Sequence, residues 1–475
     1  MDAVIGFFSY IQGLGVSVMM PIIITVIGLV LGAGLGKSIK SGLMIGVAFI
    51  GLNLVINNLL GTTLAPAVQQ MVERFGLELS VIDVGWPAAA SIAMGSAVGL
   101  LVIPLGMIVN MVMLATNTTQ TLDVDIWNYW HFAFTGALVS ILTDNVALGF
   151  AAAVLNMVIV LVIADVTAPE VEKSLNMPGV SLPQGFSAAY APIAMVVNWV
   201  IDRIPGVRDI DINLNSMQAK LGFFGEPLFL GTAIGLIIGC VAYLDPSNIL
   251  GTLPSILMLG VSMGAVLVLI PQMAGILGDG ITPISEAAAA FIEKRFKNRG
   301  KIYIGLDSTV GIGQPVTLSL SLIIIPVMIV LAILLQPLGN RFLPFTDLAA
   351  APYMFVLVTP IVRENGFRGL VTGIIIAALG MFIATAMSPL MSAAALESGF
   401  DIAASAGSAD ALISSLCDGA NPLAWLFVFA SGLNAYIGLA VIAVLCVALA
   451  LWNRARIIRV AHHEVAGAQA AQEAE

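Results

Sequence analysis

The chain has 475 residues, of which 59% are hydrophobic and only 10% are charged, with a formal net charge of −10. Soluble proteins carry about 25% charged residues, so 46 charged side chains could not cover a soluble molecule of this size (28 acidic and 18 basic). The composition excludes a soluble enzyme, a disordered chain and a nucleic-acid-binding protein. Because the apolar runs are continuous, it also excludes an outer-membrane barrel, whose strands are short and alternate apolar with polar residues.

A series of apolar runs follows along the chain, each long enough to cross most or all of a bilayer. They lie at 13–35, 42–60, 88–116, 131–165, 228–244, 254–277, 315–335, 345–362, 367–387 and 423–452. A spanning helix needs about 20 apolar residues, so the pattern predicts an all-α polytopic membrane protein with about 10 or 11 transmembrane helices plus re-entrant hairpins.

Polar and helix-breaking residues interrupt several of these runs. The breaks are Gly85-Trp86-Pro87, Thr143-Asp144-Asn145, Gly225-Glu226-Pro227, Gly311-Ile312-Gly313-Gln314-Pro315 and Asp418-Gly419-Ala420-Asn421-Pro422. Irregular backbone survives at membrane depth only where protein or a water-filled cavity satisfies it. Interrupted hydrophobic segments therefore point to the substrate site of a transporter.

The placement of Lys and Arg predicts the orientation, because cytoplasmic loops carry an excess of basic residues. The densest basic run is 293–301 and the second is 454–459, so we expect both of them, and the C-terminus, on the cytoplasmic side. Counting crossings back from the tail leaves only Arg74 and Arg341 facing out. The absence of Lys and Arg between 75 and 172 favours a re-entrant hairpin over 131–165, and 400–430 is a second candidate hairpin.

The same pattern predicts the organisation of the chain. We expect an N-terminal membrane half at 1–165 and a C-terminal membrane half at 223–452. A cytoplasmic or interfacial connector at 166–222 joins them, and its apolar piece 188–204 is predicted to be a helix lying at the membrane surface. A cytoplasmic tail follows at 453–475.

Ionisable side chains inside apolar runs are costly and usually functional. The acidic candidates and the one histidine are Asp144, Glu226, Asp279, Glu286, Asp307 and His131, and the uncharged candidates are Asn145, Gln272, Thr282, Gln314 and Asn421. No Lys or Arg lies centrally in these runs. Carboxylates accept hydrogen bonds while amides donate and accept, which suits a neutral polyhydroxylated substrate such as a sugar alcohol, and also suits a cation.

Each candidate has a structural alternative. A carboxylate at Glu226 is favoured by the dipole of the helix that starts at Pro227. Asp144 fits the N-cap of the helix that follows it. Gln314 has a similar alternative, at the start of the helix that begins with Pro315. Asp307 fits an interfacial position. The alternative for His131 is a place in the interfacial aromatic belt formed by Trp127, Tyr129 and Trp130, while Asp279 and Glu286 fit a cytoplasmic loop.

Several enzyme signatures are missing from the sequence. There is no Walker A loop, no HExxH zinc motif and no Gly-x-Ser-x-Gly elbow. We therefore expect no metal site, no cofactor and no phosphotransferase centre in this chain. Any phosphate chemistry would come from another polypeptide.

Four segments of the chain stand out by their sequence and their order. They are Gly6-Phe7-Phe8-Ser9-Tyr10-Ile11-Gln12-Gly13-Leu14-Gly15, Asp125-Ile126-Trp127-Asn128-Tyr129-Trp130-His131, Gly222-Phe223-Phe224-Gly225-Glu226-Pro227 and Phe296-Lys297-Asn298-Arg299-Gly300-Lys301. In this order they resemble the galactitol-type membrane subunit (IIC component) of the bacterial phosphotransferase system. The similarity extends over roughly residues 4–450.

The resemblance implies a multi-pass permease of the bacterial inner membrane that moves a hexitol inward while a separate IIB subunit phosphorylates it from a phosphocysteine, with IIA as the earlier phosphate donor. By similarity to the ascorbate-type permeases, it also implies a homodimer with an elevator mechanism. We expect the hexitol among Asp144, Asn145, Glu226, Gln314, Asp307 and Asn421, with Glu226 or else His131 as general base. Phospho-IIB is expected to dock on Lys294, Arg295, Lys297, Arg299 and Lys301. The alternative is an ion-coupled secondary transporter that uses Asp144 or Glu226 as its ion site.

Overall fold

The computed structural model describes residues 16–55, 59, 61–76, 80–210, 212, 227–295, 301–344, 346–406 and 408–474. Its α-helices are α2 (Val16–Val30), α3 (Leu35–Asn53), α4 (Gly61–Phe75), α5 (Gly85–Gly95), α6 (Gly99–Ala115), α7 (Trp130–Thr143), α8 (Val146–Leu175), α9 (Gly185–Ile201), α11 (Pro227–Tyr243), α12 (Ile249–Arg295), α13 (Thr309–Ile312), α14 (Pro315–Leu335), α15 (Ala351–Phe355), α16 (Val358–Ile361), α17 (Gly366–Glu397), α18 (Ile402–Ala406), α19 (Pro422–Leu433) and α20 (Ala435–Ala474). The 3-10 turns are η2 (Ile126–Tyr129), η4 (Gln336–Leu338) and η5 (Asp347–Ala350).

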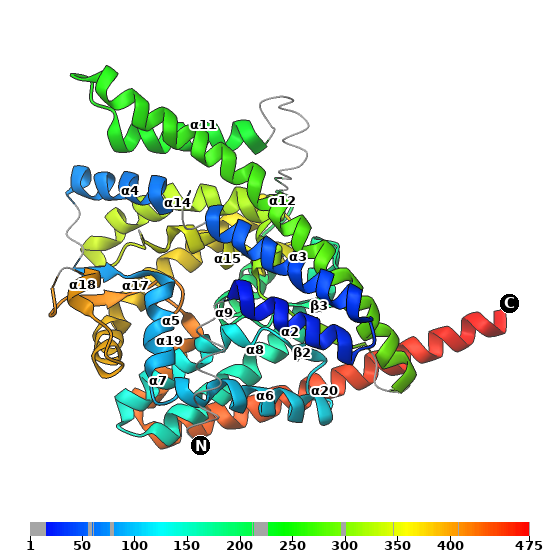
Figure 1. Cartoon of the computed structure of the whole chain (residues 1–475). Coiled ribbons are helices and arrows are strands. Elements are labelled where there is room, and N and C mark those ends of the chain that lie inside the picture. The colour runs from blue at the N-terminus through cyan, green and yellow to red at the C-terminus, as the bar shows by residue number, and fades with distance from the viewer. Residues whose placement is uncertain are drawn as a thin grey trace.

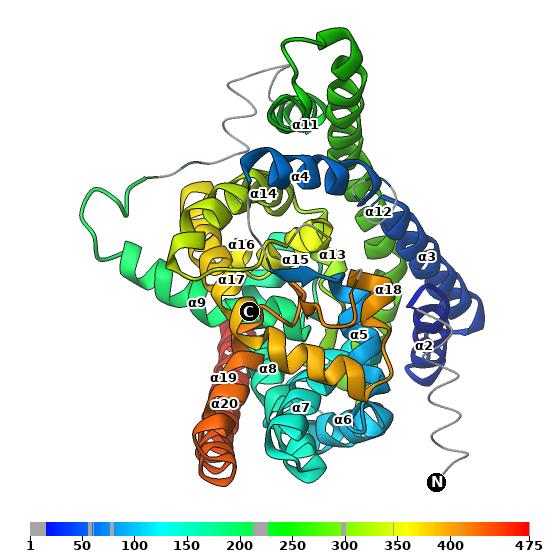
Figure 2. The same ribbon diagram turned by 90° about the vertical axis from the view of Figure 1, so that its left-hand side faces the viewer.

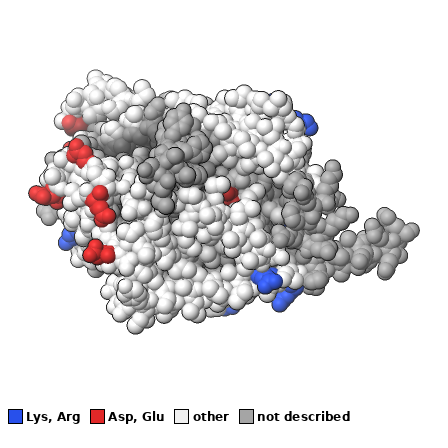
Figure 3. All heavy atoms as spheres, turned by 60° about the horizontal axis from the view of Figure 1, so that its bottom comes forward, with Lys and Arg blue, Asp and Glu red and all other residues white. Residues whose placement is uncertain are grey.

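The fold is that of an all-α polytopic membrane protein. Among the described residues, five helices are long and apolar enough to cross a membrane, and the bent pair α5–α6 makes a sixth if it counts as one span. Six shorter apolar helices accompany them. The face in Figure 3 carries few charged side chains, as expected for a surface in contact with lipid. The total of ten or eleven crossings stays a prediction.

A layer of helices lies at the periphery of the molecule. α2, α3, α4, α11 and α12 pack chiefly on one another, and Figures 1 and 2 show them along one side, with α19 and α20 on the other. α12 has 47 residues and is about 70 Å long, more than twice the thickness of the bilayer core. We call these five helices the outer layer and the rest of the described chain the core.

The predicted breaks that fall in the described residues are real interruptions of helices, and Gly225-Glu226 of a further break lies outside these residues. α5 and α6 meet at an angle of 86°. α7 and α8 form a helical hairpin whose turn is at 144–145, the predicted tip. Since α8 has 30 residues and is long enough to cross a membrane, the re-entrant character of this hairpin stays a prediction. The break at 418–422 lies between a short strand and α19. These interruptions leave polar backbone and side chains between helices in the core.

The connector departs from the sequence prediction. The prediction of a surface helix over 188–204 is wrong for its first half, because the side chains from Gly185 to Ala191 on α9 are buried. From Pro192 onward one side of α9 is exposed, and after its end Arg203 lies 3.5 Å over the Trp199 ring. Alanines at 188, 189, 191 and 194 let α9 pack closely against α8 and α17.

Candidate functional site

Short parallel strands bring the broken helices together. β1 (Val81–Asp83) pairs with β5 (Leu412–Ser414), and β4 (Tyr303–Gly305) lies between β2 (Thr121–Asp123) and β3 (Val180–Ser181). Because the strands of each sheet are parallel, the segments that follow them leave from the same edge. These segments are 84–87, 124–131, 182–187, 306–309 and 415–421.

His131 lies in the first turn of α7 and is only 2% exposed. Its Nδ1 lies 2.7 Å from Asp418 Oδ2, in the turn between β5 and α19. An ionised carboxylate can only accept a hydrogen bond, so Nδ1 is the donor. The other ring nitrogen, Nε2, is buried and has no partner among the described residues.

Asn421 fixes the position of this pair. Its Oδ1 accepts hydrogen bonds from Leu423 N and Ala424 N at the start of α19, while its Nδ2 donates to the Gly185 carbonyl at 3.2 Å and to Asp418 Oδ1 at 3.3 Å. A side chain at position 185 would clash, because a Cβ there would lie 2.6 Å from the His131 Cβ. The N-terminal ends of α9 and α19 therefore meet beside His131.

A second group of polar side chains surrounds Asp307. Asn128 Nδ2 donates to Asp125 Oδ2 at 2.7 Å and to Asp307 Oδ2 at 2.6 Å. Asp307 Oδ1 accepts from the Thr309 backbone N–H at 2.7 Å and from Thr309 Oγ1 at 2.6 Å. Tyr353 OH lies 2.9 Å from Thr309 Oγ1. This arrangement joins the segments that follow β2 and β4 to α15.

Trp130 connects the two groups. Its Nε1 donates to Asn128 Oδ1 at 3.2 Å, and its ring centroid lies 4.0 Å from that of His131. Ser187 on α9 makes a further link, since its Oγ lies 2.7 Å from both Gln184 Oε1 and the Tyr353 carbonyl. We call the combined set the polar site; it consists of Asp125, Asn128, His131, Asp307, Thr309, Tyr353, Asp418 and Asn421.

Asp347, in η5, holds one wall of the polar site in place. Its Oδ1 accepts a hydrogen bond from Trp86 N at 2.7 Å, and its Oδ2 accepts from Leu416 N at 2.9 Å and Cys417 N at 3.3 Å. The Asp347 N–H in turn donates to Asp83 Oδ2 at 2.7 Å. One carboxylate thus joins the break after β1 to the turn that carries Asp418.

The polar site holds both hydrogen-bond donors and acceptors. Burial, reinforced by the nearby Asp307 and Asp123, raises the pKa of Asp125 well above its usual range, and burial raises the pKa of Asp123 to about 8. No described Lys or Arg side chain forms an ion pair with a carboxylate of the site. Such a mixed lining, without a paired Lys or Arg, suits a neutral hydroxylated molecule better than an anion.

The structure brings together three of the residues predicted from sequence. His131, Asp307 and Asn421 lie in the polar site, and the aromatic-belt interpretation of His131 is wrong because its side chain is buried. The interfacial interpretation of Asp307 is wrong for the same reason, since this residue is 7% exposed. Gln314 caps α14, with Oε1 accepting from Thr317 N at 2.8 Å.

Asp144 and Asn145 are not part of the polar site. They lie at the end of α7 opposite to His131, and the 14 residues of that helix separate the two ends by about 20 Å. Asp144 is exposed and left-handed, with φ 48°. The N-cap of α8 is Asn145 rather than Asp144, since Asn145 Oδ1 accepts from Ala147 N and Leu148 N.

Other predicted residues fall elsewhere. Glu226, Lys297 and Arg299 lie outside the described residues, as do the side chains of Lys294 and Arg295. Lys301 forms an ion pair with Glu172. The expected loop around Asp279 and Glu286 is wrong, because both residues belong to the continuous helix α12, as do Gln272 and Thr282.

Sequence reasoning missed several residues of the polar site. Asp125 and Asn128 stand in the segment quoted for its resemblance, but they precede the apolar run and were not candidates. Asp418 lies in a recognised break, three residues before Asn421. A carboxylate and an amide three residues apart, just before a helix-starting proline, are the signal that could have identified it.

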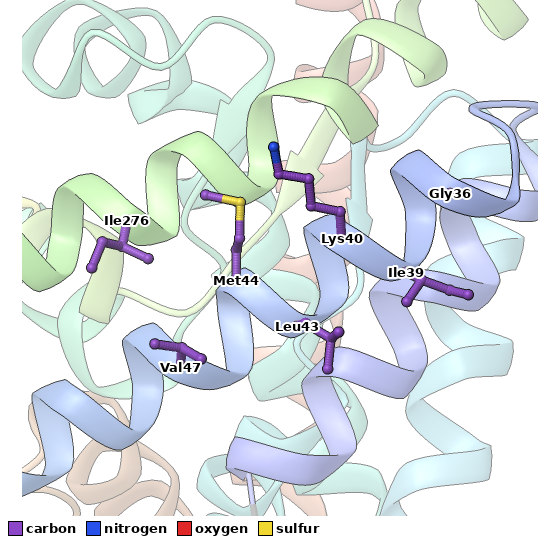
Figure 4. A pocket seen from close by; sticks show the side chains of 7 residues that line it. All are labelled: Gly36, Ile39, Lys40, Leu43, Met44, Val47 and Ile276. Carbon is purple, nitrogen blue, oxygen red and sulfur yellow. The ribbon is translucent and has the colours of Figure 1, made fainter.

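The open groove in Figure 4 is a different feature. It has a volume of about 430 Å³ and lies between α3 and α12, lined by apolar side chains and Lys40. In Figure 4 the Lys40 side chain points from α3 toward α12. Such a groove on an apolar outer layer offers no pattern of hydrogen bonds for a sugar alcohol.

Comparison with known proteins shows the family of this chain. Residues 10–405 match the model of the family EIIC-GAT, the PTS system sugar-specific permease component. The PTS system galactitol-specific EIIC component of Escherichia coli K12 is 36% identical over 421 residues, which cover 88% of this chain and 89% of that protein, and its counterpart from Escherichia coli O157:H7 matches equally. The chain therefore belongs to the family of sugar-specific permease components of the phosphotransferase system.

Proposed function

We propose that this protein is the membrane subunit that carries galactitol, or a closely similar hexitol, across the bacterial inner membrane for phosphorylation by a separate IIB subunit. The observation that carries the proposal is the polar site, in which neutral donors and carboxylate acceptors lie buried between broken helices. The two relatives that are named galactitol-specific support this choice of substrate. The proposed contacts are Asp307 and Asn421, with Gln314 at the start of α14.

His131 is the proposed general base. Its Nδ1 is held by Asp418 and its Nε2 is free, which is the arrangement of a histidine that accepts a proton while a carboxylate orients the ring. In the transfer step, a hydroxyl oxygen of the hexitol attacks the phosphorus of phosphocysteine on IIB, and the phosphorus–sulfur bond breaks. The hydroxyl proton moves to His131 Nε2.

Replacing His131 by glutamine tests this role. The variant keeps a donor toward Asp418 but has no basic nitrogen, so galactitol binding should change by less than about threefold while phosphorylation falls by about 10²–10⁴-fold. The measurement is galactitol affinity of the purified protein, beside the phosphorylation rate with IIA and IIB. Asp144→Asn, at the far end of α7, is the control. Unchanged phosphorylation in the histidine variant would remove His131 as the base.

The cytoplasmic side is proposed to be the end at which basic residues gather. Lys301 pairs with Glu172, and Arg368 pairs with Asp202. At the other end, Arg74 donates to the carbonyls of Val241 and Leu244. This separation agrees with an excess of basic residues inside, with the C-terminus cytoplasmic.

Phospho-IIB is proposed to dock on the basic run 294–301. Changing Lys294, Arg295, Lys297 and Arg299 together to glutamine should lower the phosphorylation rate about tenfold or more at low salt, because charge complementarity speeds encounter. Galactitol affinity should stay the same. A variant with Lys173, Arg454, Arg456 and Arg459 changed to glutamine is the matched control, since it removes equal charge elsewhere on the same proposed side. An equal loss in both variants would contradict docking at this run.

The division into outer layer and core supports an elevator mechanism. We expect the core, which contains the polar site, to move against α2, α3, α4, α11 and α12, and two copies to associate through this outer layer. Exposed apolar side chains on α3 such as Leu43, Val47 and Ile50 are available for such contacts. Light scattering that gives a monomer in mild detergent and in lipid nanodiscs would contradict the dimer.

A further inference from the structure

Asp125 and Asp307 are buried carboxyl groups that share one hydrogen-bond donor. Asn128 Nδ2 reaches Oδ2 of both, and the two residues are 2% and 7% exposed. Two carboxylates this close in a low-dielectric interior do not both ionise unless a cation compensates them. In the described part of the chain, neither forms an ion pair with Lys or Arg. The pair therefore holds one proton.

The surroundings decide which residue holds that proton. Asp307 Oδ1 accepts two hydrogen bonds from Thr309, so this oxygen already acts as an acceptor. Asp125 Oδ1 is buried with no partner among the described residues, and Asp123 adds a further carboxylate beside it. The proton belongs on Asp125.

The other titratable groups near the pair do not reverse this assignment. Tyr129, Tyr353 and Cys417 lie close enough to feel these carboxylates, and their neutral forms are uncharged. His131 is already paired with Asp418. None of them supplies a positive charge that would ionise Asp125.

Building on the proposed galactitol transport, we infer that Asp125 and Asp307 bind two neighbouring hydroxyl groups of the sugar alcohol, with Asp125 as a neutral acid that donates through Oδ1 and Asp307 as a carboxylate that accepts. A protonated carboxyl has one O–H donor, and an ionised one accepts only. One donor beside one acceptor matches a vicinal diol, in which each hydroxyl both donates and accepts. The pair therefore determines specificity for adjacent hydroxyls. Because only one of the two carboxyl groups is ionised, a cation at this place would meet one negative charge instead of two.

Substitution by asparagine distinguishes the two roles. Asp125→Asn replaces a neutral donor by another neutral donor, so galactitol affinity should stay within about threefold of the wild type. Asp125→Ala removes the donor and should lower affinity about tenfold, and Asp307→Asn removes a charged acceptor and should lower it by about 10–100-fold. Affinity is measured by calorimetry on the purified protein with galactitol, and Asp144→Asn is the control.

Two results would overturn the inference. Equal loss in Asp125→Asn and Asp125→Ala would mean that Asp125 acts as a carboxylate, and unchanged affinity in both would mean that it does not touch substrate. If the alanine variant fails to fold, infrared spectroscopy of the substrate-free protein at pH 7 decides, since a protonated carboxyl band should weaken in Asp125→Asn and persist in Asp307→Asn. A wild type that binds no galactitol, with this band present, would instead overturn the proposed function.

Discussion

Asp418→Ala is expected to abolish galactitol phosphorylation and to lower the free energy of unfolding by about 3 kcal/mol. The substitution removes the acceptor of the His131 Nδ1 proton and one acceptor of the Asn421 amide. Both side chains are buried, so water does not replace the lost bonds without cost. The ring of His131 would also lose the group that sets the orientation of its unpartnered Nε2, the proposed base.

Asp418→Asn separates these two effects. Asparagine can still accept the hydrogen bond from His131, so stability should recover by at least about half, whereas the carboxylate that would stabilise the imidazolium formed in the transfer step is gone. Phosphorylation should therefore remain at least about tenfold below the wild type. Thermal unfolding in detergent and the phosphorylation rate with IIA and IIB are the measurements. An alanine variant with wild-type rate and stability would contradict a role for the His131–Asp418 pair.

Asp347→Ala is expected to cause the largest loss of stability, by about 3 kcal/mol or more at pH 7. The carboxylate accepts hydrogen bonds from three backbone N–H groups, the half-buried one of Trp86 and the buried ones of Leu416 and Cys417, and each buried group left without a partner costs about 1–3 kcal/mol. Because the total stability of a folded protein is only about 5–15 kcal/mol, the yield of folded protein should fall visibly.

The pH dependence of this effect has a definite sign. Burial raises the pKa of Asp347 from 3.8 to about 6, so between these values the folded state holds the proton more tightly than the unfolded chain. The contribution of this group to wild-type stability therefore falls as pH rises through that window, and Asp347→Ala should lack that slope. Asp410→Ala, an exposed aspartate beside β5, is the control. Equal melting temperatures for Asp347→Ala and the wild type from pH 4 to pH 8 would contradict the proposal that Asp347 stabilises the fold by connecting the segments after β1 and β5.

The membrane fold could be predicted from sequence because apolar runs report burial in lipid directly. The breaks at 85–87, 144–145 and 418–422 were also visible, since Gly, Pro and polar residues interrupt those runs. The outer layer could not be predicted, because four of its helices (α2, α3, α11 and α12) lie in or overlap apolar runs like those of the core, while the amphipathic α4 lies outside every such run. Which helices pack together depends on contacts between residues far apart in the chain, such as those of α3 with α12.

The polar site could be predicted only in part. His131, Asp307 and Asn421 were candidates because each is polar beside an apolar run. Their association depends on strands of two or three residues, such as β2 and β4, which are too short to give an alternating pattern. Asp144 was a reasonable candidate by the same criterion, but the length of α7 places it at the opposite end.

Uptake of labelled galactitol into vesicles tests the central claim most directly. The vesicles contain this protein, with IIA, IIB and the phosphate carriers supplied on the side of the vesicle membrane that corresponds to the cytoplasm. We predict that label is trapped as galactitol phosphate, that trapping requires IIB, and that collapsing the proton gradient leaves it unchanged. Accumulation of free galactitol driven by the gradient, without IIB, would contradict the account and establish an ion-coupled transporter.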